Sequence, residues 1–381
     1  ARMKQVFEGD LDIERLVLAI SAETGVSIEA ENTLIIFDEV QEVPKALTSL
    51  KYFHENAPQY AIVAAGSLLG VALHQGTSFP VGKVDFLDLY PLNFREFLCA
   101  MGEKQFVSML DSCDTQMVTV FKTKYIERLR EYYFVGGMPE VVKDFSEKKD
   151  YNRVRAIQKN LINYYQQDFS KHAEIKLVPR LNLVWNSIPM QLAKENKKYI
   201  YGQVREGSRA KDFELAIQWL LDCGLIHKVQ RIQKPDLPLK AYIDFDAFKL
   251  FLVDIGLLIA MTDLDAKVII EGNKIFTEFK GSLTEQYILQ QLISDVGVIP
   301  YYYSTQNSKG EIDFLVQGKT SVIPIEVKAE ENLKAKSLKA FCEKYQPSYA
   351  VRTSMSDYRE QDWMTNIPLY AIKWIENYVN Q

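Results

Sequence analysis

Apolar and polar residues follow different periods along the chain, and each period predicts a type of element. Leu34–Phe37 are four apolar residues in a row, which is typical of a buried strand in a parallel sheet. Residues 43–55 have apolar side chains at helical spacing and lead into a second apolar run at 61–65. The order strand, helix, strand predicts the start of a parallel α/β sheet.

Later stretches have other patterns. Residues 96–180 contain long runs of helical periodicity, which predict an all-helical lid or connector. Residues 181–265 contain helical stretches followed by an alternating hairpin, and this order predicts a winged-helix-like domain. Residues 266–381 combine a helix with short alternating strands, and Pro324 inside one of them predicts an edge strand. We therefore expect an α/β protein of several domains.

Length and composition agree with a folded protein of more than one domain. The chain has 381 residues, of which 47% are hydrophobic and 25% charged, as in average globular proteins. Its net charge is -5, so any contact with nucleic acid would depend on a local basic patch. No apolar run is long enough to span a bilayer, which predicts no membrane role. The cysteines are scattered, which argues against disulfides and zinc and favours the cytoplasm: Cys99, Cys113, Cys223 and Cys342.

Two adjacent acids, Asp38 and Glu39, follow the first apolar run. This arrangement is typical of a Walker B element, in which the first acid holds the Mg²⁺ shell and the second orients or deprotonates the attacking water. It predicts Asp38 and Glu39 as catalytic residues, of which Asp38 also binds ATP and Mg²⁺. A core strand that runs into a polar turn would have the same pattern, so both interpretations stay open.

A Walker A loop, Gly-x-x-x-x-Gly-Lys-Ser/Thr, should precede such a strand, and the sequence contains none. The nearest imitation, Gly76 to Lys83, has the wrong spacing, includes Pro80 and follows Asp38 in the chain. The loop matters because its backbone N–H groups hold the phosphates. The simplest inference is an N-terminally shortened ATPase, for which ATP binding needs the missing segment and is impaired in the chain as it stands.

The second apolar run ends in Gly66-Ser67. An AAA-type ATPase places a polar sensor residue at the end of the strand beside Walker B, where it reaches the γ-phosphate or the water. Ser67 is therefore a candidate catalytic and ATP-binding residue. The simpler interpretation is a turn, since serine after glycine is common in turns.

Five stretches resemble, in the same order, a family of prokaryotic AAA-like ATPases with a C-terminal tail related to PD-(D/E)XK nucleases: Leu34–Gln41, Ala65–Ser67, Leu89–Phe97, Tyr133–Glu140 and Phe248–Leu257. The resemblance implies a partial AAA-type core over 1–95, with ATP and Mg²⁺ as cofactors. Many relatives have an arginine before the Leu-Tyr-Pro segment, as a finger for a neighbouring subunit. The nearest cation here is Lys83, which cannot form the bidentate fork of arginine.

A second group of candidate residues lies near the C-terminus. Asp313 is in the run 311–316, and Glu326 and Lys328 alternate on one face of the run 323–328. With Glu285, on a helix that opens at Gly281, they resemble the PD-(D/E)XK signature. The resemblance implies that Glu285, Asp313 and Glu326 bind a metal and that Lys328 joins Asp313 and Glu326 in catalysis. The alternative is an ordinary sheet whose charged residues form a structural ion network.

Basic residues cluster at the start of the presumed third helix of the winged-helix-like domain: Arg205, Arg209 and Lys211. A winged helix would turn this end toward DNA phosphates. The acids around them, Glu206, Asp212 and Glu214, weaken the basic patch, so solvated charges or a protein contact are alternatives.

Three functions stay open. The first is an ATP-dependent switch whose nucleotide state repositions the winged helix and the nuclease-like tail. The second is a metal-dependent nuclease that works without ATP, and the third is a catalytically inactive regulator that binds DNA or protein. A protein partner or a homo-oligomer is compatible with each of them.

Overall fold

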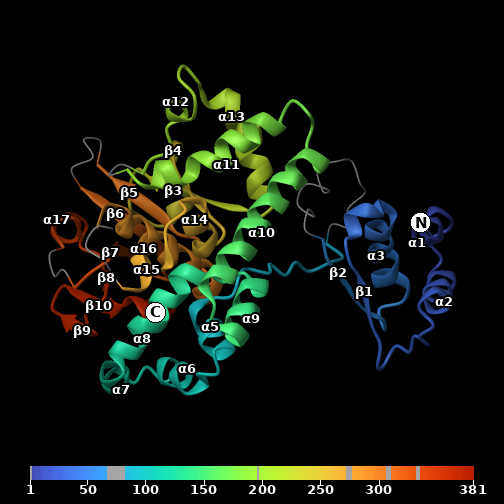
Figure 1. The fold of residues 1–381 in the computed structure, drawn as a ribbon, viewed down its shortest axis with the longest axis horizontal. Helices are drawn as coiled ribbons and strands as arrows, with labels where there is room; N and C mark the ends of the chain where they lie inside the picture. Colours follow the sequence, from blue (N-terminus) through green and yellow to red (C-terminus); the bar gives the residue numbers. More distant parts are fainter. Residues whose placement is uncertain (1, 67–81, 195–196, 272–276, 306–309, 332–334) are drawn as a thin grey trace. The chain divides into compact units, whose positions relative to one another are not determined.

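The computed structural model describes residues 2–66, 82–194, 197–271, 277–305, 310–331 and 335–381 (Figure 1). The chain divides into two compact units. The N-terminal unit comprises residues 1–89 with 218–225, and the C-terminal unit comprises 90–217 with 226–381.

A parallel strand pair forms the centre of the N-terminal unit. β1 (Leu34–Phe37) pairs with β2 (Ala61–Ala64), and α3 (Pro44–Asn56) joins them, so the predicted order strand, helix, strand is confirmed. One face of the pair, which includes Ile35 and Phe37, packs into a buried cluster with α1 (Arg2–Glu8), α2 (Ile13–Thr24) and α3. The capping carboxylate of Asp12 fixes the start of α2 by accepting a hydrogen bond from the N–H of Arg15 at 2.9 Å.

The other face of this strand pair is open. Leu34 is 54% exposed, Ile36 61% and Val63 48%. The prediction of a strand buried on both faces is therefore wrong for the described part of the chain. The reason is that the helices of the buried cluster cover only one side of the pair, so alternate side chains of β1 remain in solvent.

Helices form the first half of the C-terminal unit, as predicted for 96–180. A capping box of Asn93 and Glu96 starts the first helix, and Asp150 caps the longest. The helices are α5 (Phe94–Ala100), α6 (Lys104–Asp111), α7 (Thr115–Val120), α8 (Lys122–Val135), α9 (Pro139–Lys148) and α10 (Tyr151–His172).

The next elements keep the order predicted from the sequence. They are α11 (Val178–Leu192), α12 (Tyr201–Val204), α13 (Ala210–Asp222), β3 (Ile226–Ile232) and β4 (Ile243–Leu252). β3 and β4 form an antiparallel hairpin, and β3 also pairs in parallel with β5 (Tyr301–Ser304). The hairpin therefore belongs to a larger sheet, and the winged-helix assignment stays a prediction.

Within the described residues this larger sheet has eight strands, in the order β4-β3-β5-β6-β7-β8-β10-β9 (Figure 1). Its remaining strands are β6 (Glu311–Gln317), β7 (Val322–Val327), β8 (Val351–Ser354), β9 (Arg359–Gln361) and β10 (Met364–Pro368). β7 lies between β6 and β8, so the edge position predicted from Pro324 is wrong. Pairing with β8 begins at Ile325, and the missing N–H of Pro324 therefore costs no bond to that neighbour.

Helices and short turns complete the C-terminal unit. α17 (Lys336–Tyr345) packs on β5 and β6 through a buried cluster that includes Tyr303, Ile312 and Leu338. The other elements are α14 (Ile255–Met261), α15 (Ala266–Ile270), α16 (Thr277–Gln291), a π-helical turn (Leu292–Val296), a 3₁₀ segment (Leu369–Ile375) and α18 (Glu376–Val379).

Three of the stretches that carry the family resemblance meet at one buried junction. Asp254 caps α14, and its carboxylate accepts hydrogen bonds from the N–H groups of Gly137 (2.6 Å) and Leu257 (3.0 Å). The carbonyl of Gly137 in turn accepts the N–H of Leu92 at 2.8 Å. A Cβ at Gly137 would overlap the carbonyl oxygen of Leu92, so this contact requires glycine. These stretches therefore have a structural role in the C-terminal unit.

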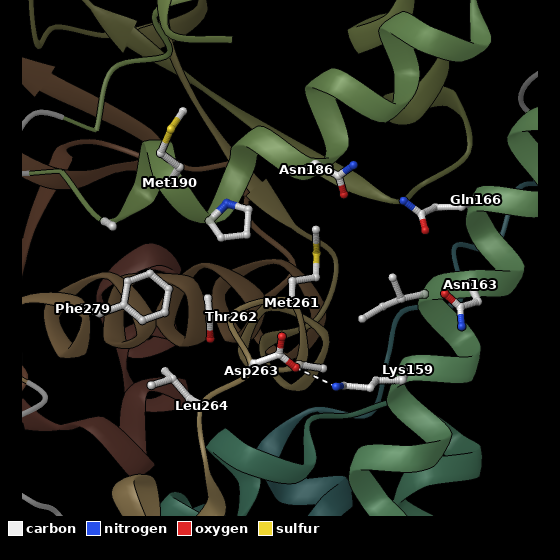
Figure 2. Close-up of a pocket in the computed structure, with 14 residues that line it drawn as sticks. Lys159, Asn163, Gln166, Asn186, Met190, Met261, Thr262, Asp263, Leu264 and Phe279 are labelled. Atoms are coloured by element: carbon white, nitrogen blue, oxygen red, sulfur yellow. Dashed lines mark ion pairs between the residues drawn. The ribbon is translucent and has the colours of Figure 1, made fainter.

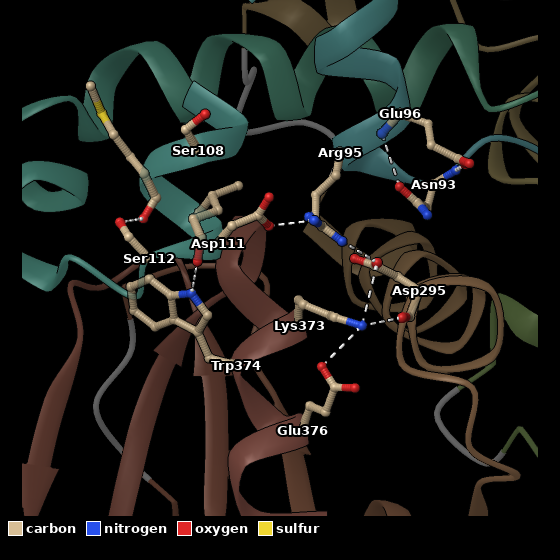
Figure 3. Close-up of polar contacts among 12 residues, drawn as sticks. Asn93, Arg95, Glu96, Ser108, Asp111, Ser112, Asp295, Lys373, Trp374 and Glu376 are labelled. Carbon is tan, nitrogen blue, oxygen red and sulfur yellow. Dashed lines mark hydrogen bonds and ion pairs between the residues drawn. The ribbon is translucent and has the colours of Figure 1, made fainter. Parts of the chain in front are cut away.

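Ion pairs tie the first helices to the end of the chain (Figure 3). The guanidinium of Arg95 binds Asp111 and lies 2.8 Å from Oδ1 of Asp295, which is in the π-helical turn. Lys373 donates a hydrogen bond to the carbonyl of Asp295 at 2.6 Å, and the indole N–H of Trp374 donates to the carbonyl of Leu110 at 2.7 Å. The helical region and the C-terminal segment are thus parts of one packed unit.

Candidate functional sites

The acid pair Asp38 and Glu39 follows β1 directly and is exposed. Ala65, which follows β2, lies beside it, because its N–H donates to the carbonyl of Phe37 at 2.8 Å and its carbonyl accepts the N–H of Val40 at 3.0 Å. The two carboxylates therefore stand at the carboxyl end of two parallel strands. In open α/β sheets, this edge is where ligands bind.

The backbone bends sharply between the two acids. Glu39 has φ 49° and ψ 44°, a left-handed conformation that is uncommon for a residue other than glycine. Oδ1 of Asp38 accepts the N–H of Glu39 at 3.0 Å, and the side-chain amide of Gln41 donates to Oε2 of Glu39. Strained conformations of this kind are concentrated at binding and catalytic sites.

Two exposed carboxylate groups fit the preference of Mg²⁺ for oxygen ligands. Ser67, the predicted sensor residue, lies outside the described residues. Lys83, the cation nearest to the expected position of an arginine finger, forms an ion pair with Glu55 at 3.3 Å. The residues of this edge could thus hold a metal ion and a water molecule, while the sequence contains no glycine-rich loop for the phosphates.

In the C-terminal unit, the structure brings Glu285 and Asp313 together. Glu285 lies on α16 and Asp313 on β6, and their side chains are hydrogen-bonded. Oδ2 of Asp313 also accepts the N–H of Val327 at 2.8 Å. Burial, and then the neighbouring carboxylate of Glu285, raise the pKa of Asp313 to about 7. A protonated Asp313 can donate to Glu285, which accounts for the close approach of two acids.

Two lysines neutralise this carboxyl pair. Lys197 binds Oε1 of Glu285, while Nζ of Lys249 lies 3.7 Å from Oε2 and also binds Glu311. Burial acts to raise the pKa of Glu285, but the charges of Lys197 and Lys249 outweigh it, and the pKa is lowered. For Lys249, burial acts to lower the pKa of the ammonium group. The carboxylates of Glu285 and Glu311 outweigh burial, so this pKa is raised. The two lysine ammonium groups therefore supply the positive charge beside this carboxyl pair.

Glu326 turns the other way, toward α17, and Lys328 forms an ion pair with it. Oε1 of Glu326 lies 2.7 Å from Nζ of Lys328, and Oε2 accepts the N–H of Leu338 at 3.3 Å. These two residues do lie close together, as predicted, but the structure does not bring them to Glu285 and Asp313. Among the described residues, no group of three or more His, Cys, Asp or Glu side chains is placed to hold a metal ion.

A register shift between β5 and β6 explains this separation. Tyr303 pairs with Ile312, whereas Tyr301 pairs with Leu315, so β6 has one extra residue there. Ile312 and Leu315 both join the buried cluster on α17, although strict alternation would put them on opposite faces. The bulge between them turns Asp313 toward α16.

The sequence interpretation missed Lys197, Lys249 and Glu311. A signal was present for Lys249, which interrupts the apolar run of β4 and whose side chain is fully buried. A lone cation in such a run predicts a buried acidic partner, because an unpaired charge is too costly to bury. Lys197 and Glu311 have no comparable local signal.

The predicted basic cluster is only partly assembled. Arg205 lines a pocket of about 290 Å³ together with Arg180, Gly207 and Ser208. Neither Arg180 nor Arg205 has an ion-pair partner in the part of the chain that the structure describes. The N–H of Arg209 donates to the carboxylate of Asp212 at 2.8 Å, while Lys211 is exposed. Arg180, on α11, is a member of this cluster that the sequence analysis missed.

A larger pocket of about 990 Å³ lies between α10, α11 and the turn after α14 (Figure 2). Its wall combines amide side chains with apolar ones, and Lys159 and Asp263 form an ion pair at 2.7 Å. The amides are Asn163, Gln166 and Asn186, and the apolar side chains include Met190, Met261 and Phe279. No sequence motif marks this pocket.

No helix in the described ranges is both long and apolar enough to cross a bilayer.

Comparisons with known proteins give three matches to family models. Residues 3–98 match an AAA domain, residues 126–268 match a domain of unknown function (DUF8612), and residues 280–372 match another domain of unknown function (DUF4143). No curated protein matches the chain. Among solved structures, a Walker-type ATPase of Pyrococcus abyssi is 14% identical, with 67% of this chain and 68% of that chain covered and a TM-score of 0.41. Residues 3–98 are therefore similar to an AAA domain.

Proposed function

We propose that the edge of β1 and β2 is the metal- and water-binding side of an AAA-type ATP site. The observation that carries the proposal is the exposed pair Asp38 and Glu39 at the carboxyl end of two parallel strands, within the residues that match an AAA domain. Asp38 would bind Mg²⁺, Glu39 would act on the attacking water, and Ser67 would be the sensor.

Each acid has a distinct role in this proposal. Asp38 uses Oδ1 to accept the N–H of Glu39, and its Oδ2 has no partner among the described residues, so Oδ2 is available to a metal ion. When bound, Mg²⁺ neutralises charge on the phosphate oxygens of ATP. Glu39 would accept the proton of the water, a step that general-base residues accelerate by roughly 10²–10⁴-fold.

Nucleotide binding in the presence of Mg²⁺ tests the role of Asp38. The sequence has no Walker A loop, so we expect weak affinity and an assay at high ATP concentration. Calorimetry of the wild type should show Mg²⁺-dependent binding of ATP, and Asp38→Asn should remove the dependence on Mg²⁺. Glu14→Gln, which changes another exposed acid of the same unit, is the control. Equal Mg²⁺ dependence in Asp38→Asn and wild type would contradict the role, and an absence of binding would favour an inactive regulator.

The second candidate function is binding of a nucleic-acid backbone by the C-terminal unit. The specific observation is the pocket lined by Arg180 and Arg205, two guanidinium groups without an ion-pair partner in the described ranges. Arginine binds phosphate through two parallel hydrogen bonds, and Ser208 adds a hydroxyl to the same pocket. An ATP-dependent switch would then use the nucleotide state to change the presentation of this surface.

Fluorescence anisotropy with duplex DNA at several salt concentrations tests this function. Each phosphate contact contributes a slope of roughly -0.9 to the dependence of log K on log salt. Arg180→Ala and Arg205→Ala should each reduce the slope by about that amount. Arg359→Ala, which changes an exposed arginine on β9, should leave it unchanged. Equal affinity and slope in all three variants and the wild type would refute the contact.

For the C-terminal carboxylates, we propose a structural ion network of Glu285, Asp313, Glu311, Lys197 and Lys249 in place of the nuclease function that the resemblance implied. The support is that lysines neutralise the carboxyl pair and that Glu326 faces α17. The chain incubated with DNA and Mg²⁺ or Mn²⁺ should therefore cleave nothing. Cleavage by the wild type that Lys328→Ala abolishes would overturn this proposal and restore the metal-dependent nuclease.

A further inference from the structure

The turn after β1 contains a third polar residue, Gln41, that no motif assigns to the chemistry. It lies in the 3₁₀ turn Val40–Glu42, two residues after Glu39. Its side-chain nitrogen Nε2 donates a hydrogen bond to Oε2 of Glu39. The turn itself is anchored to the neighbouring strand, since the N–H of Val40 donates to the carbonyl of Ala65. Gln41 is therefore held on rigid backbone while it contacts the side chain of Glu39.

Chemistry fixes the orientation of this amide. A carboxylate only accepts hydrogen bonds, so the NH₂ side of Gln41 must face Glu39. Its oxygen Oε1 then points to Gly66, where it is buried and has no hydrogen-bond partner among the described residues. Burying an amide oxygen in this way is unfavourable, so the arrangement needs a compensating contact, and the bond to Glu39 supplies it.

Gly66 makes the arrangement possible. A Cβ at position 66 would overlap Oε1 of Gln41, and any residue other than glycine would displace the amide. This packing contact adds to the backbone hydrogen bonds through which Ala65 joins the two stretches. This contact accounts for a glycine at this point without any need for an unusual backbone conformation, because the φ of Gly66 is not in the left-handed region.

We propose that Gln41 is a positioning residue that holds the carboxylate of Glu39 at the strand edge, with Gly66 as its support. The inference rests on the proposed function, in which Glu39 acts on the attacking water. A glutamate side chain on an exposed turn would otherwise adopt several rotamers. The left-handed backbone of Glu39 and the amide of Gln41 together restrict it. A base that is misplaced by about 1 Å can lose about 10²-fold in rate.

Gln41→Met is the main test, since methionine keeps the length and shape of glutamine but has no donor. We expect kcat for ATP to fall by about 10- to 100-fold, while KM and the affinity for Mg²⁺-ATP stay unchanged. Gly66→Ala should reduce kcat in the same way, and the double variant should be no worse than the single ones, because both changes remove one contact. Unchanged kcat in Gln41→Met, or additive losses, would overturn the inference.

A spectroscopic readout tests the contact without any turnover. In protein labelled with ¹⁵N-glutamine, the side-chain NH₂ signals of Gln41 should shift in Glu39→Ala and not in Glu14→Gln. Signals that do not move in Glu39→Ala would exclude the hydrogen bond. If the wild type neither binds nor hydrolyses ATP, the proposed function fails and the inference falls with it. If the wild type is active and Gln41→Met equals it, the inference alone fails.

Discussion

Replacing Asp313 by asparagine tests whether the carboxyl pair of the C-terminal unit is a structural network. Asparagine has the shape of a protonated aspartate: its oxygen can accept the N–H of Val327, and its NH₂ group can donate to Glu285, as the acid does. The variant therefore keeps both contacts at every pH. It removes the cost of ionising Asp313 beside Glu285 in a largely buried place.

The expected magnitude follows from the pKa. Burial and Glu285 raise the pKa of Asp313 from 3.8 to about 7. Between these values the folded protein binds a proton that the unfolded chain has lost, so the free energy of unfolding falls as the pH rises from about 4 to about 7. At about 1.36 kcal/mol per unit, the loss is at most about 4 kcal/mol. The pKa of Glu285 is lowered, so its contribution changes below its ordinary value of 4.5 and not in this range.

Urea unfolding at pH 5, 6, 7 and 8 measures this effect. We expect the wild type to lose stability from pH 5 to about pH 7 relative to Asp313→Asn, so that the advantage of the variant is small near pH 5 and largest at pH 7 and 8. Asp236→Asn is the control, because Lys234 lowers the pKa of that exposed carboxyl and its titration lies below the range. If the stability of wild type and of Asp313→Asn changed with pH in parallel, the reasoning would be refuted. It would also be refuted if Mg²⁺ removed the pH dependence of the wild type, since a metal ion would then bind Glu285 and Asp313.

Three further predictions concern the stability of the C-terminal unit, measured as thermal or urea unfolding. Lys249→Met should destabilise it by about 3–5 kcal/mol, because it leaves Glu285 and Glu311 partly uncompensated; unchanged stability would contradict the network. Gly137→Ala should lower the free energy of unfolding by about 1–3 kcal/mol, because the added Cβ overlaps Leu92. Gly207→Ala is the control, since its Cβ would contact no other atom and the only loss would come from its left-handed backbone. Arg95→Ala should cost about 2–4 kcal/mol, since it leaves the buried carboxylate of Asp295 without its guanidinium; a loss no larger than that of the exposed Arg153→Ala would refute this estimate.

The elements with strong local signals were predictable from the sequence. The apolar run before Asp38, the helical spacing after it and the second run give the parallel pair β1 and β2, because period and length distinguish strand from helix. Alternation likewise predicts the proximity of Glu326, in β7, and Lys328, directly after it, which form an ion pair. Each of these predictions depends on residues that are close together in the chain.

The features that the sequence did not reveal depend on distant residues. The face that Asp313 occupies is decided by the register shift between β5 and β6, and nothing within β6 marks it. The position of β7 inside the sheet depends on its pairing with β8, so the edge position that Pro324 predicted was wrong. The exposure of Leu34 and Ile36 depends on which helices pack against the strand pair. Gln41 belongs to the stretch Leu34–Gln41, but its proposed role can be inferred only once the structure places Gly66 next to it.

Turnover of Mg²⁺-ATP by the wild type and by Glu39→Gln tests the central claim most directly. At the high ATP concentration that the missing Walker A loop requires, the account predicts hydrolysis by the wild type and a loss of roughly 10²–10⁴-fold in Glu39→Gln, with the weak binding of ATP equal in the two proteins. Equal turnover by the two proteins would contradict the claim that Glu39, at the end of β1, acts on the attacking water.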